Sequence, residues 1–266
     1  MKFKRGKGFS GKLSRGLYLC FVVFLFLNCG LNNFVSAEPL RVDPLLKTSW
    51  KQRDMYAVFT PENERLGCWS VAFAQILFYH GLVPTGATSY TGTYYSVEAD
   101  FENPSVDLQY VVSRITPETS AIQAEHTARY LWYAAAASGK DFGTTRYTGN
   151  SDVRRDRIAE YYGISSRRVR RTSHGEEGVI EFIRDELKEG RPLLLHVDGE
   201  TGDGGSTAHA LVIDGCRGEN QNFEVHLNFG WEGVGDGWYS FFEPYDTEYG
   251  NYNDYERWVL RIHPPK

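Results

Sequence analysis

Cysteine is scarce in this sequence. Four of the 266 residues are cysteine, and two of these, Cys20 and Cys29, fall in an apolar N-terminal stretch. The remaining pair, Cys68 and Cys216, can form only one disulfide bond, which excludes a small scaffold held together by disulfides. We expect even that bond to be absent, because Cys68 has the surroundings of a reactive thiol. A disulfide between Cys68 and Cys216 is the alternative.

A hydrophobic run long enough to span a membrane is also lacking. The apolar run at 17–27 is shorter than the roughly 20 residues that a spanning helix needs. It follows a basic start without acidic residues, and the small residues of 35–37 come after it. This order is typical of a secretory signal peptide over 1–37. We therefore expect a protein that is secreted, periplasmic or at the cell surface, without stable membrane association after signal removal. An uncleaved anchor is the alternative.

An excess of positive charge is absent as well. The 29 lysine and arginine residues face 34 aspartate and glutamate residues, and loss of the six positive charges in 1–37 takes the formal net charge from −5 to about −11. Nucleic acids and anionic membranes repel such a chain, so neither is an expected partner. We interpret the one local basic cluster as a solvated loop between two helices. Its members are Arg167, Arg168, Arg170 and Arg171.

Helical patterns occupy the first part of the chain and strand patterns the last part. We expect helices at 68–80, 105–115, 119–138, 153–162 and 176–189. We expect strands at 192–197, 208–214, 223–229, 238–242 and 257–262, and an irregular stretch at 90–104. This segregation predicts an α+β fold. A helical N-terminal lobe would pack on a C-terminal antiparallel β lobe, with a cleft between them.

Cys68 begins the first helical pattern and directly follows Gly67. A sulfur at a helix N-terminus lies near the positive end of the macrodipole, which favours the thiolate. The glycine gives the backbone the freedom to turn sharply and lets a substrate approach. Cys68 is therefore a candidate nucleophile. A buried structural cysteine is the alternative interpretation.

His209 is the candidate base for this thiol. It lies early in the strand pattern at 208–214, 141 positions after Cys68. A thiol needs an adjacent base to attack a carbonyl at neutral pH, and imidazole is suited to that task. Papain-type sites place this histidine about 130–150 residues after the cysteine. A histidine buried in the core of the strand lobe is the alternative.

Three further side chains complete the predicted site. Asn228, in the next strand pattern, would orient His209 through its ring N–H, and Trp231 would shield that hydrogen bond from water. The side-chain amide of Gln52 and the backbone N–H of Cys68 would be the two hydrogen-bond donors of an oxyanion hole. A turn asparagine and a packing tryptophan are the alternative reading of the first two residues.

These residues and their surroundings resemble the streptopain family of papain-like cysteine peptidases. The shared motifs are Trp-x-Gln at 50–52, Gly-Cys-x-x-x-Ala-x-Ala-Gln-Ile at 67–76, His-Ala-x-Val-Ile-Asp-Gly at 209–215 and His-x-Asn-x-Gly-Trp-x-Gly-x-x-Asp-Gly at 226–237. The resemblance implies a papain-like two-lobe fold and an endopeptidase that takes extended peptides, with an apolar pocket for the second residue before the cut. It implies no metal or organic cofactor.

The same resemblance assigns the roles within the site. Cys68 is the nucleophile and His209 the general base and acid. Gln52 lines the oxyanion hole, while Asn228 and Trp231 support the histidine. The predicted organisation is then a signal peptide at 1–37, an extended segment carrying Gln52 at 38–64 and a catalytic domain at 65–266.

The sequence departs from the family pattern in three places. Trp69 and Ser70 replace smaller residues after the cysteine and are expected to narrow the cleft, and Phe229 stands where the family usually has tryptophan. About 30 residues separate the signal from Cys68, too few for an inhibitory pro-domain, since a domain needs roughly 50 residues. A separate inhibitor protein or oxidation of Cys68 is therefore expected to restrain activity.

We predict a secreted, monomeric cysteine endopeptidase that acts on proteins or peptides. An amidase or acyl transferase acting on cell-wall peptides or other amides is an alternative, because a fold does not fix the substrate. A binding module with an inactive site is the second alternative. The joint presence of the four polar site residues argues against it.

Overall fold

The computed structural model describes residues 41–253 and 257–265, which lie in one compact unit. The signal peptide predicted at 1–37 lies outside the described residues. Within them, none of the helices combines the length and the apolar character that crossing a membrane requires.

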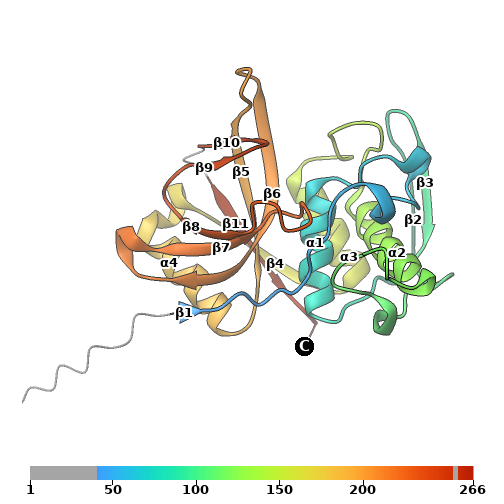
Figure 1. Cartoon of the computed structure of the whole chain (residues 1–266), viewed down its shortest axis with the longest axis horizontal. Helices are drawn as coiled ribbons and strands as arrows, with labels where there is room; N and C mark the ends of the chain where they lie inside the picture. Colours follow the sequence, from blue (N-terminus) through green and yellow to red (C-terminus); the bar gives the residue numbers. More distant parts are fainter. Residues whose placement is uncertain (1–40, 254–256, 266) are drawn as a thin grey trace, which may run out of the picture. The chain divides into compact units, whose positions relative to one another are not determined.

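The first lobe is built around three helices (Figure 1). They are α1 (Cys68–Tyr79), α2 (Ala121–Ser138) and α3 (Ser151–Tyr162). Helix α1 packs between α2 and the sheet of the other lobe, and α3 packs on α2. A two-stranded ladder of β2 (Ala87–Thr91) and β3 (Ser96–Asp100) lies at the outer edge. Short 3-10 turns lie at η1 (Asp54–Tyr56), η2 (Pro61–Asn63) and η3 (Leu108–Tyr110).

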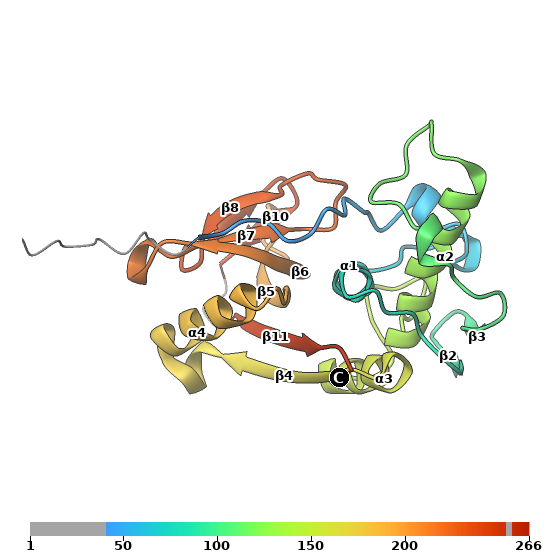
Figure 2. The same ribbon diagram turned by 90° about the horizontal axis from the view of Figure 1, so that it is seen from below.

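The second lobe is an antiparallel sheet in the order β4–β11–β5–β6–β7–β8. Its strands are β4 (Ser165–Arg170), β5 (Leu193–Glu200), β6 (Ser206–Arg217), β7 (Glu224–Asn228), β8 (Gly237–Ser240) and β11 (Trp258–His263). The short strand β1 (Arg41–Val42) pairs with β6. The hairpin of β9 (Tyr245–Thr247) and β10 (Gly250–Tyr252) pairs with β5, and the turn η4 (Asn220–Asn222) precedes β7. Helix α4 (Arg171–Lys188) covers one face of this sheet (Figure 2).

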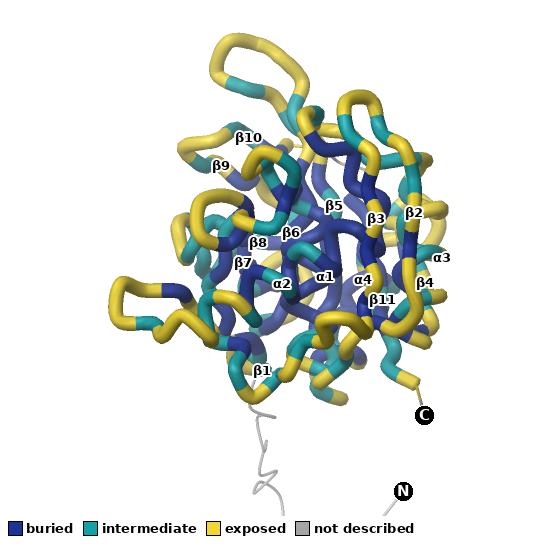
Figure 3. The backbone as a smooth tube through the Cα atoms, turned by 90° about the vertical axis from the view of Figure 1, so that its right-hand side faces the viewer, coloured by how far each residue is buried: buried dark blue, intermediate teal, exposed yellow. Residues whose placement is uncertain are grey.

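The central strands are apolar on both faces because each face meets a different core. Side chains alternate between faces along a strand. Leu194 and Val212 join the core shared with the helical lobe. Leu195 and Leu211, one residue away on the same strands, join the core under α4. Figure 3 shows most of α1 and the central parts of β5 and β6 in the buried interior of the molecule. The α+β fold class is thereby confirmed.

The helix limits follow from local capping. Ser120 caps α2 in a capping box with Gln123, and the left-handed Gly139 ends the helix. The side chain of Asn150 accepts hydrogen bonds from two backbone N–H groups at the start of α3. Helix α1 differs, because its N-cap is Gly67 and no side chain of its own segment caps it.

Two expectations for the helical lobe are wrong. The stretch 105–115 contains only the turn η3, since the carbonyls of Val112 and Ser113 accept bonds from Trp50 Nε1 and the Ser49 backbone N–H, each at 2.8 Å. Those carbonyls are therefore used by tertiary bonds and not by a helix ladder. The stretch 90–104 is also more regular than expected, because its first half forms the β2–β3 ladder.

The basic cluster was expected in a loop between two helices, but three of its arginines lie in a strand and the fourth, Arg171, begins α4. Residues Ser165–Arg170 form β4 and pair with β11 along six positions. The Arg168 guanidinium lies 4.3 Å from the centroid of the Trp258 ring, so this charged group packs over an aromatic neighbour. Three of the six β4 positions are exposed and only Val169 is buried, so a basic segment suits this edge of the sheet.

Candidate active site

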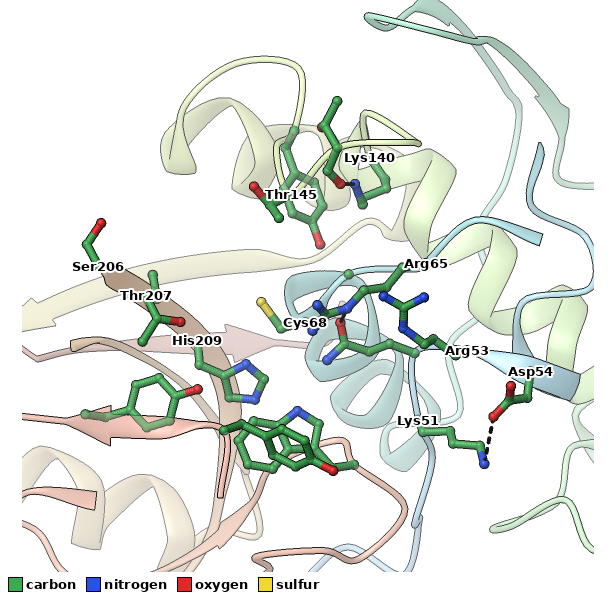
Figure 4. Close-up of a pocket in the computed structure, with 18 residues that line it drawn as sticks. Lys51, Arg53, Asp54, Arg65, Cys68, Lys140, Thr145, Ser206, Thr207 and His209 are labelled. Atoms are coloured by element: carbon green, nitrogen blue, oxygen red, sulfur yellow. Dashed lines mark hydrogen bonds and ion pairs between the residues drawn. The ribbon is translucent and has the colours of Figure 1, made fainter. Parts of the chain in front are cut away.

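A cleft of about 670 Å³ lies between helix α1 and strand β6 (Figure 4). It is lined by Lys51, Gln52, Arg53, Asp54, Arg65, Gly67, Cys68, Lys140, Thr144, Thr145, Tyr147, Ser206, Thr207, Ala208, His209, Trp231, Tyr249 and Tyr252. Four of the five predicted site residues are in this lining: Gln52, Cys68, His209 and Trp231. The fifth, Asn228, is not.

Cys68 is the first residue of α1 and is half-buried at the edge of the cleft. The preceding Gly67 has φ of +90°, a region in which L side chains are strained. A Cβ there would also collide with the Tyr147 hydroxyl. Both Cys68 and Cys216 are free thiols, so the disulfide alternative is excluded. The sulfur and the His209 ring project into the cleft from facing walls (Figure 4).

His209 lies on β6 with only 3% of its surface exposed. Its Nε2 is 2.8 Å from the backbone carbonyl oxygen of Phe229. A carbonyl can only accept, so Nε2 carries the proton and Nδ1 keeps its lone pair. The pKa of His209 is lowered to about 3, chiefly by burial; the bond to Phe229 acts in the opposite direction, and the positive charge of Arg65 adds a smaller lowering effect.

Asn228 supports the site from behind the cleft. Its Nδ2 donates to the Thr48 carbonyl at 2.7 Å. Its Oδ1 accepts from Gln75 Nε2 at 2.8 Å and from the Gly230 backbone N–H at 3.1 Å. These contacts join the end of β7 to helix α1 and to the segment before it. The orienting bond to His209 that was expected from Asn228 comes from the backbone of the next residue, Phe229.

Trp231 covers the histidine. The two ring centroids are 4.6 Å apart, and those of Trp231 and Phe229 are 4.8 Å apart in a stacked arrangement. Tyr249 also contacts Trp231 edge-on, with the two ring centroids 4.5 Å apart. This aromatic group limits the access of water to the bond between His209 and Phe229.

Gln52 presents a free amide N–H at the cleft. The side chain is 4% exposed, and its Oε1 accepts a 2.6 Å hydrogen bond from Arg65 Nε. Because a guanidinium can only donate, this bond identifies the oxygen of the amide and directs Nε2 away from Arg65. Nε2 is buried and has no hydrogen-bond partner among the described residues. A buried donor without a partner is costly unless a ligand uses it.

Trp69 and Ser70 were expected to narrow the cleft, and this expectation is wrong. Trp69 and Ser70 are 4% and 0% exposed, and neither lines the cavity. Trp69 packs between the two lobes, with ring centroids 5.7 Å from His196 and 5.4 Å from Trp258. The large side chain therefore joins helix α1 to the sheet.

Lys140 and Tyr147 are among the cleft residues that were not predicted. The Lys140 side chain is buried, its Nζ donates to the carbonyls of Asp141, Thr144 and Arg146, and burial lowers its pKa to about 8. Tyr147 Oη lies 3.2 Å from the Ser70 backbone N and 3.1 Å from Ser70 Oγ. Both lie in a loop without periodicity, so no pattern in the sequence marks them.

The arrangement combines the groups that acyl transfer needs. A thiol faces the free nitrogen of a fixed imidazole. The Gln52 amide and the backbone N–H at the start of α1 are candidate donors to an oxyanion. Among the described residues no group of three or more His, Cys, Asp or Glu side chains is placed to hold a metal ion.

Comparison with known proteins agrees with this chemistry. The model of the Peptidase C10 family matches residues 50–239. Streptopain of Streptococcus pyogenes is 26% identical over 193 residues, covering 68% of this chain and 46% of the relative. The chain thus spans about half the length of the curated relatives it matches.

Two solved structures share the fold. The active wild-type interpain A cysteine protease of Prevotella intermedia has a TM-score of 0.71 and 22% identity, over 83% of this chain and 94% of that one. A prointerpain A fragment of the same organism has a TM-score of 0.66 and 23% identity, over 83% and 71% of the two chains.

Proposed function

This chain belongs to the peptidase C10 family, and we propose that it is a cysteine endopeptidase that cuts peptide bonds with Cys68 and His209. The observation that carries the proposal is the cleft itself. The Cys68 thiol and the His209 ring face each other across it, and the unpartnered Nε2 of Gln52 lies in the same lining. The predicted family is confirmed by the match over residues 50–239.

In the acylation step, the thiol proton moves to His209 Nδ1 as the sulfur bonds to the carbonyl carbon of the substrate. The electron pair of the carbonyl π bond moves to oxygen, and the Gln52 amide and the Cys68 backbone N–H stabilise that negative charge. The tetrahedral intermediate collapses, the C–N bond breaks, and the leaving amine takes the proton from His209. A thioester to Cys68 remains.

In the second half of the reaction, His209 removes a proton from water and the hydroxide bonds to the thioester carbon. Collapse of this intermediate breaks the carbon–sulfur bond and releases the acid, and the thiol recovers its proton from the imidazolium. Each step uses the same nitrogen, Nδ1, because Nε2–H stays bonded to the Phe229 carbonyl.

Burial of His209 determines when charge forms. An imidazolium alone is disfavoured in this environment, which is why burial lowers the pKa of His209 to about 3. We infer that the free cleft holds neutral imidazole. The thiolate–imidazolium pair then forms as proton transfer to His209 creates both charges together.

The proposed biological setting rests on the N-terminal sequence pattern. The signal-peptide pattern at 1–37 supports export, so the substrates are proteins or peptides outside the cytoplasm. We propose a monomeric enzyme whose activity is restrained by a separate inhibitor protein or by oxidation of Cys68.

A peptidyl epoxide that alkylates activated thiols tests the nucleophile, with peptide mapping as the readout. We expect one label per chain at Cys68, lost in His209→Ala, together with hydrolysis of casein. Cys216 is an internal control, since it is fully buried and burial raises its pKa to about 11. Equal labelling of Cys216, or labelling of Cys68 that survives His209→Ala, would refute the proposed pair.

A further inference from the structure

The part of the cleft next to Gln52 carries two guanidinium groups, and we propose that Arg53 and Arg65 form a subsite for a carboxylate of the bound peptide. An acidic side chain is the expected source of that carboxylate. This inference rests on the proposed function, because it names the class of peptide that the cleft would take.

The cations that line the cleft are not equivalent. Lys51 is already paired with two carboxylates, since its Nζ lies 2.8 Å from Glu232 and 3.0 Å from Asp54. Lys140 is occupied as well, by three backbone carbonyls. Across the part of the chain that the structure describes, Arg53 and Arg65 form no ion pair with a carboxylate.

Arg65 is held in place and still has donors to offer. Its Nε–H is fixed by the 2.6 Å bond to Gln52 Oε1, and the side chain is half-buried in the cleft lining. A guanidinium has five N–H donors in a planar fork. The four on the terminal nitrogens have no partner among the described residues, so they can bind a carboxylate in the bidentate geometry that arginine favours.

Arg53 directly follows Gln52 in the chain and also lines the cleft. Asp54, the one carboxylate in the lining, is 3.0 Å from Lys51 Nζ, and this pairing leaves Arg53 available. Figure 4 shows Arg53 and Arg65 on the wall that carries Cys68. Arg65 is bonded to the side-chain amide of Gln52, and Arg53 is the next residue after Gln52 in the chain, so both arginines belong to the part of the cleft around this proposed oxyanion donor.

The electrostatics of the cleft favour an anionic ligand. The chain as a whole is acidic, with a formal net charge of −5, whereas its cleft is lined by four Lys or Arg side chains and one carboxylate. Concave sites with charge of one sign concentrate ligands of the opposite sign. Burial is the main cause that lowers the pKa of His209 and raises that of Tyr252 on the facing wall, and the charge of Arg65 makes a smaller downward contribution to both, so it acts across the width of the cleft. A carboxylate bound to Arg65 would offset its effect on His209.

The test is direct binding to the Cys68→Ala chain, which retains the cleft and lacks the nucleophile. The first set of probes is fluorescent octapeptides with amidated C-termini, each with an apolar residue and a single Asp, which is moved from position to position on both sides of that residue. The second set has Asn in place of Asp. A third set has Asn in place of Asp and a free C-terminal carboxylate, placed at the same distances from the apolar residue as the Asp side chain of the first set. We expect about tenfold tighter binding of the Asp peptide than of the Asn peptide at one position, as a charge-assisted bidentate contact gives.

Arginine variants in the same Cys68→Ala background identify the subsite. Arg53→Gln with Arg65→Gln should bring the ratio of the two dissociation constants to within about twofold of one. Arg167→Gln with Arg170→Gln removes the same charge from exposed positions of β4 outside the cleft and should retain the tenfold ratio. A ratio near one at every position, or one that survives the Arg53 and Arg65 changes, would overturn the proposal. Preference for the free C-terminus would support a carboxylate subsite whose ligand is the chain end.

Turnover by the unaltered chain separates this proposal from the proposed function. If Asp and Asn peptides are cut at equal rates and bind equally, the subsite is refuted while the peptidase stands. If Asp peptides bind tightly through the two arginines but nothing is cut and Cys68 takes no epoxide label, the peptidase is refuted while the subsite stands.

Discussion

The Nε2–H group of His209 donates a 2.8 Å hydrogen bond to the backbone carbonyl of Phe229. A backbone acceptor explains how phenylalanine can stand at a position where the family usually has tryptophan. The carbonyl does the orienting whichever side chain is present. The ring contributes separately, by stacking on Trp231 at a centroid distance of 4.8 Å.

The buried neutral state of His209 predicts a pH dependence of stability. Burial lowers the folded pKa to about 3, whereas the unfolded value is about 6.5. The unfolded chain therefore binds the extra proton first, and the contribution of this group is complete above the unfolded pKa and decreases as pH falls toward the folded pKa. Between pH 7 and pH 5, the wild-type free energy of unfolding should fall by about 2 kcal/mol more than that of His209→Asn.

Urea denaturation at the two pH values measures this difference. Asp236 acts in the opposite direction over part of this range, because burial raises its pKa to about 6; its contribution cancels when wild type and variant are compared. His174→Asn, at an exposed position, is the control and should behave as wild type. Parallel pH profiles for wild type and His209→Asn would contradict a buried neutral imidazole.

Asn228→Ala should reduce stability more than chemistry. The substitution leaves Gln75 Nε2, the Gly230 N–H and the Thr48 carbonyl without their partner, and unsatisfied buried groups cost about 1–3 kcal/mol each when nothing replaces the bond. We expect the free energy of unfolding to fall by about 2–4 kcal/mol, and kcat at low temperature to fall far less than in His209→Ala. Urea titration and initial rates measure the two effects. Equal loss of kcat in both variants, at unchanged stability, would mean that Asn228 acts on His209 directly.

The features that could be predicted from the sequence are those with local signals. Helix α1 was expected at 68–80 and occupies Cys68–Tyr79, because its apolar spacing and the following Gly81 are visible in the chain. The central strands were expected within a few residues of β5, β6 and β7, since their apolar runs end at polar turns. The family was predicted from linked motifs and is confirmed.

The features that could not be predicted depend on contacts between distant segments. The turn η3 replaces a helix because Trp50 and Ser49 bond to carbonyls more than 60 positions away. The basic strand β4 forms because β11 pairs with it. Lys140 enters the site through carbonyls of its own loop, and no periodic pattern signals such a loop. The acceptor for the His209 ring N–H is a backbone carbonyl, and a motif of side chains cannot predict which backbone atom takes that role.

Gln52→Ala should separate oxyanion stabilisation from activation of the thiol. Removing one oxyanion donor lowers kcat by roughly 100-fold to 1,000-fold in enzymes of this kind of chemistry, and we expect a loss in that range with a smaller change in KM. Alkylation of Cys68 by iodoacetamide forms no oxyanion, so its rate should stay near that of wild type. Initial-rate kinetics measure the loss of kcat, and the rate of alkylation measures the reactivity of the thiol. A parallel fall in both rates would show that Gln52 acts on the cysteine and not on the carbonyl oxygen.

Tyr147→Phe should weaken the start of the helix that carries Cys68. The helix has no cap from its own segment, since Gly67 precedes it, and Tyr147 Oη accepts from the Ser70 N–H at 3.2 Å in place of such a cap. Loss of an N-terminal cap costs about 1 kcal/mol, and we expect the free energy of unfolding to fall by that amount. Because the ring remains, the packing beside Lys140 is retained, and kcat/KM should fall only a few-fold as the position of Cys68 becomes less well defined. Tyr94→Phe, at a residue that is 70% exposed, is the matched control, and an equal effect of the two substitutions on unfolding by urea would show that the hydroxyl of Tyr147 does not cap the helix.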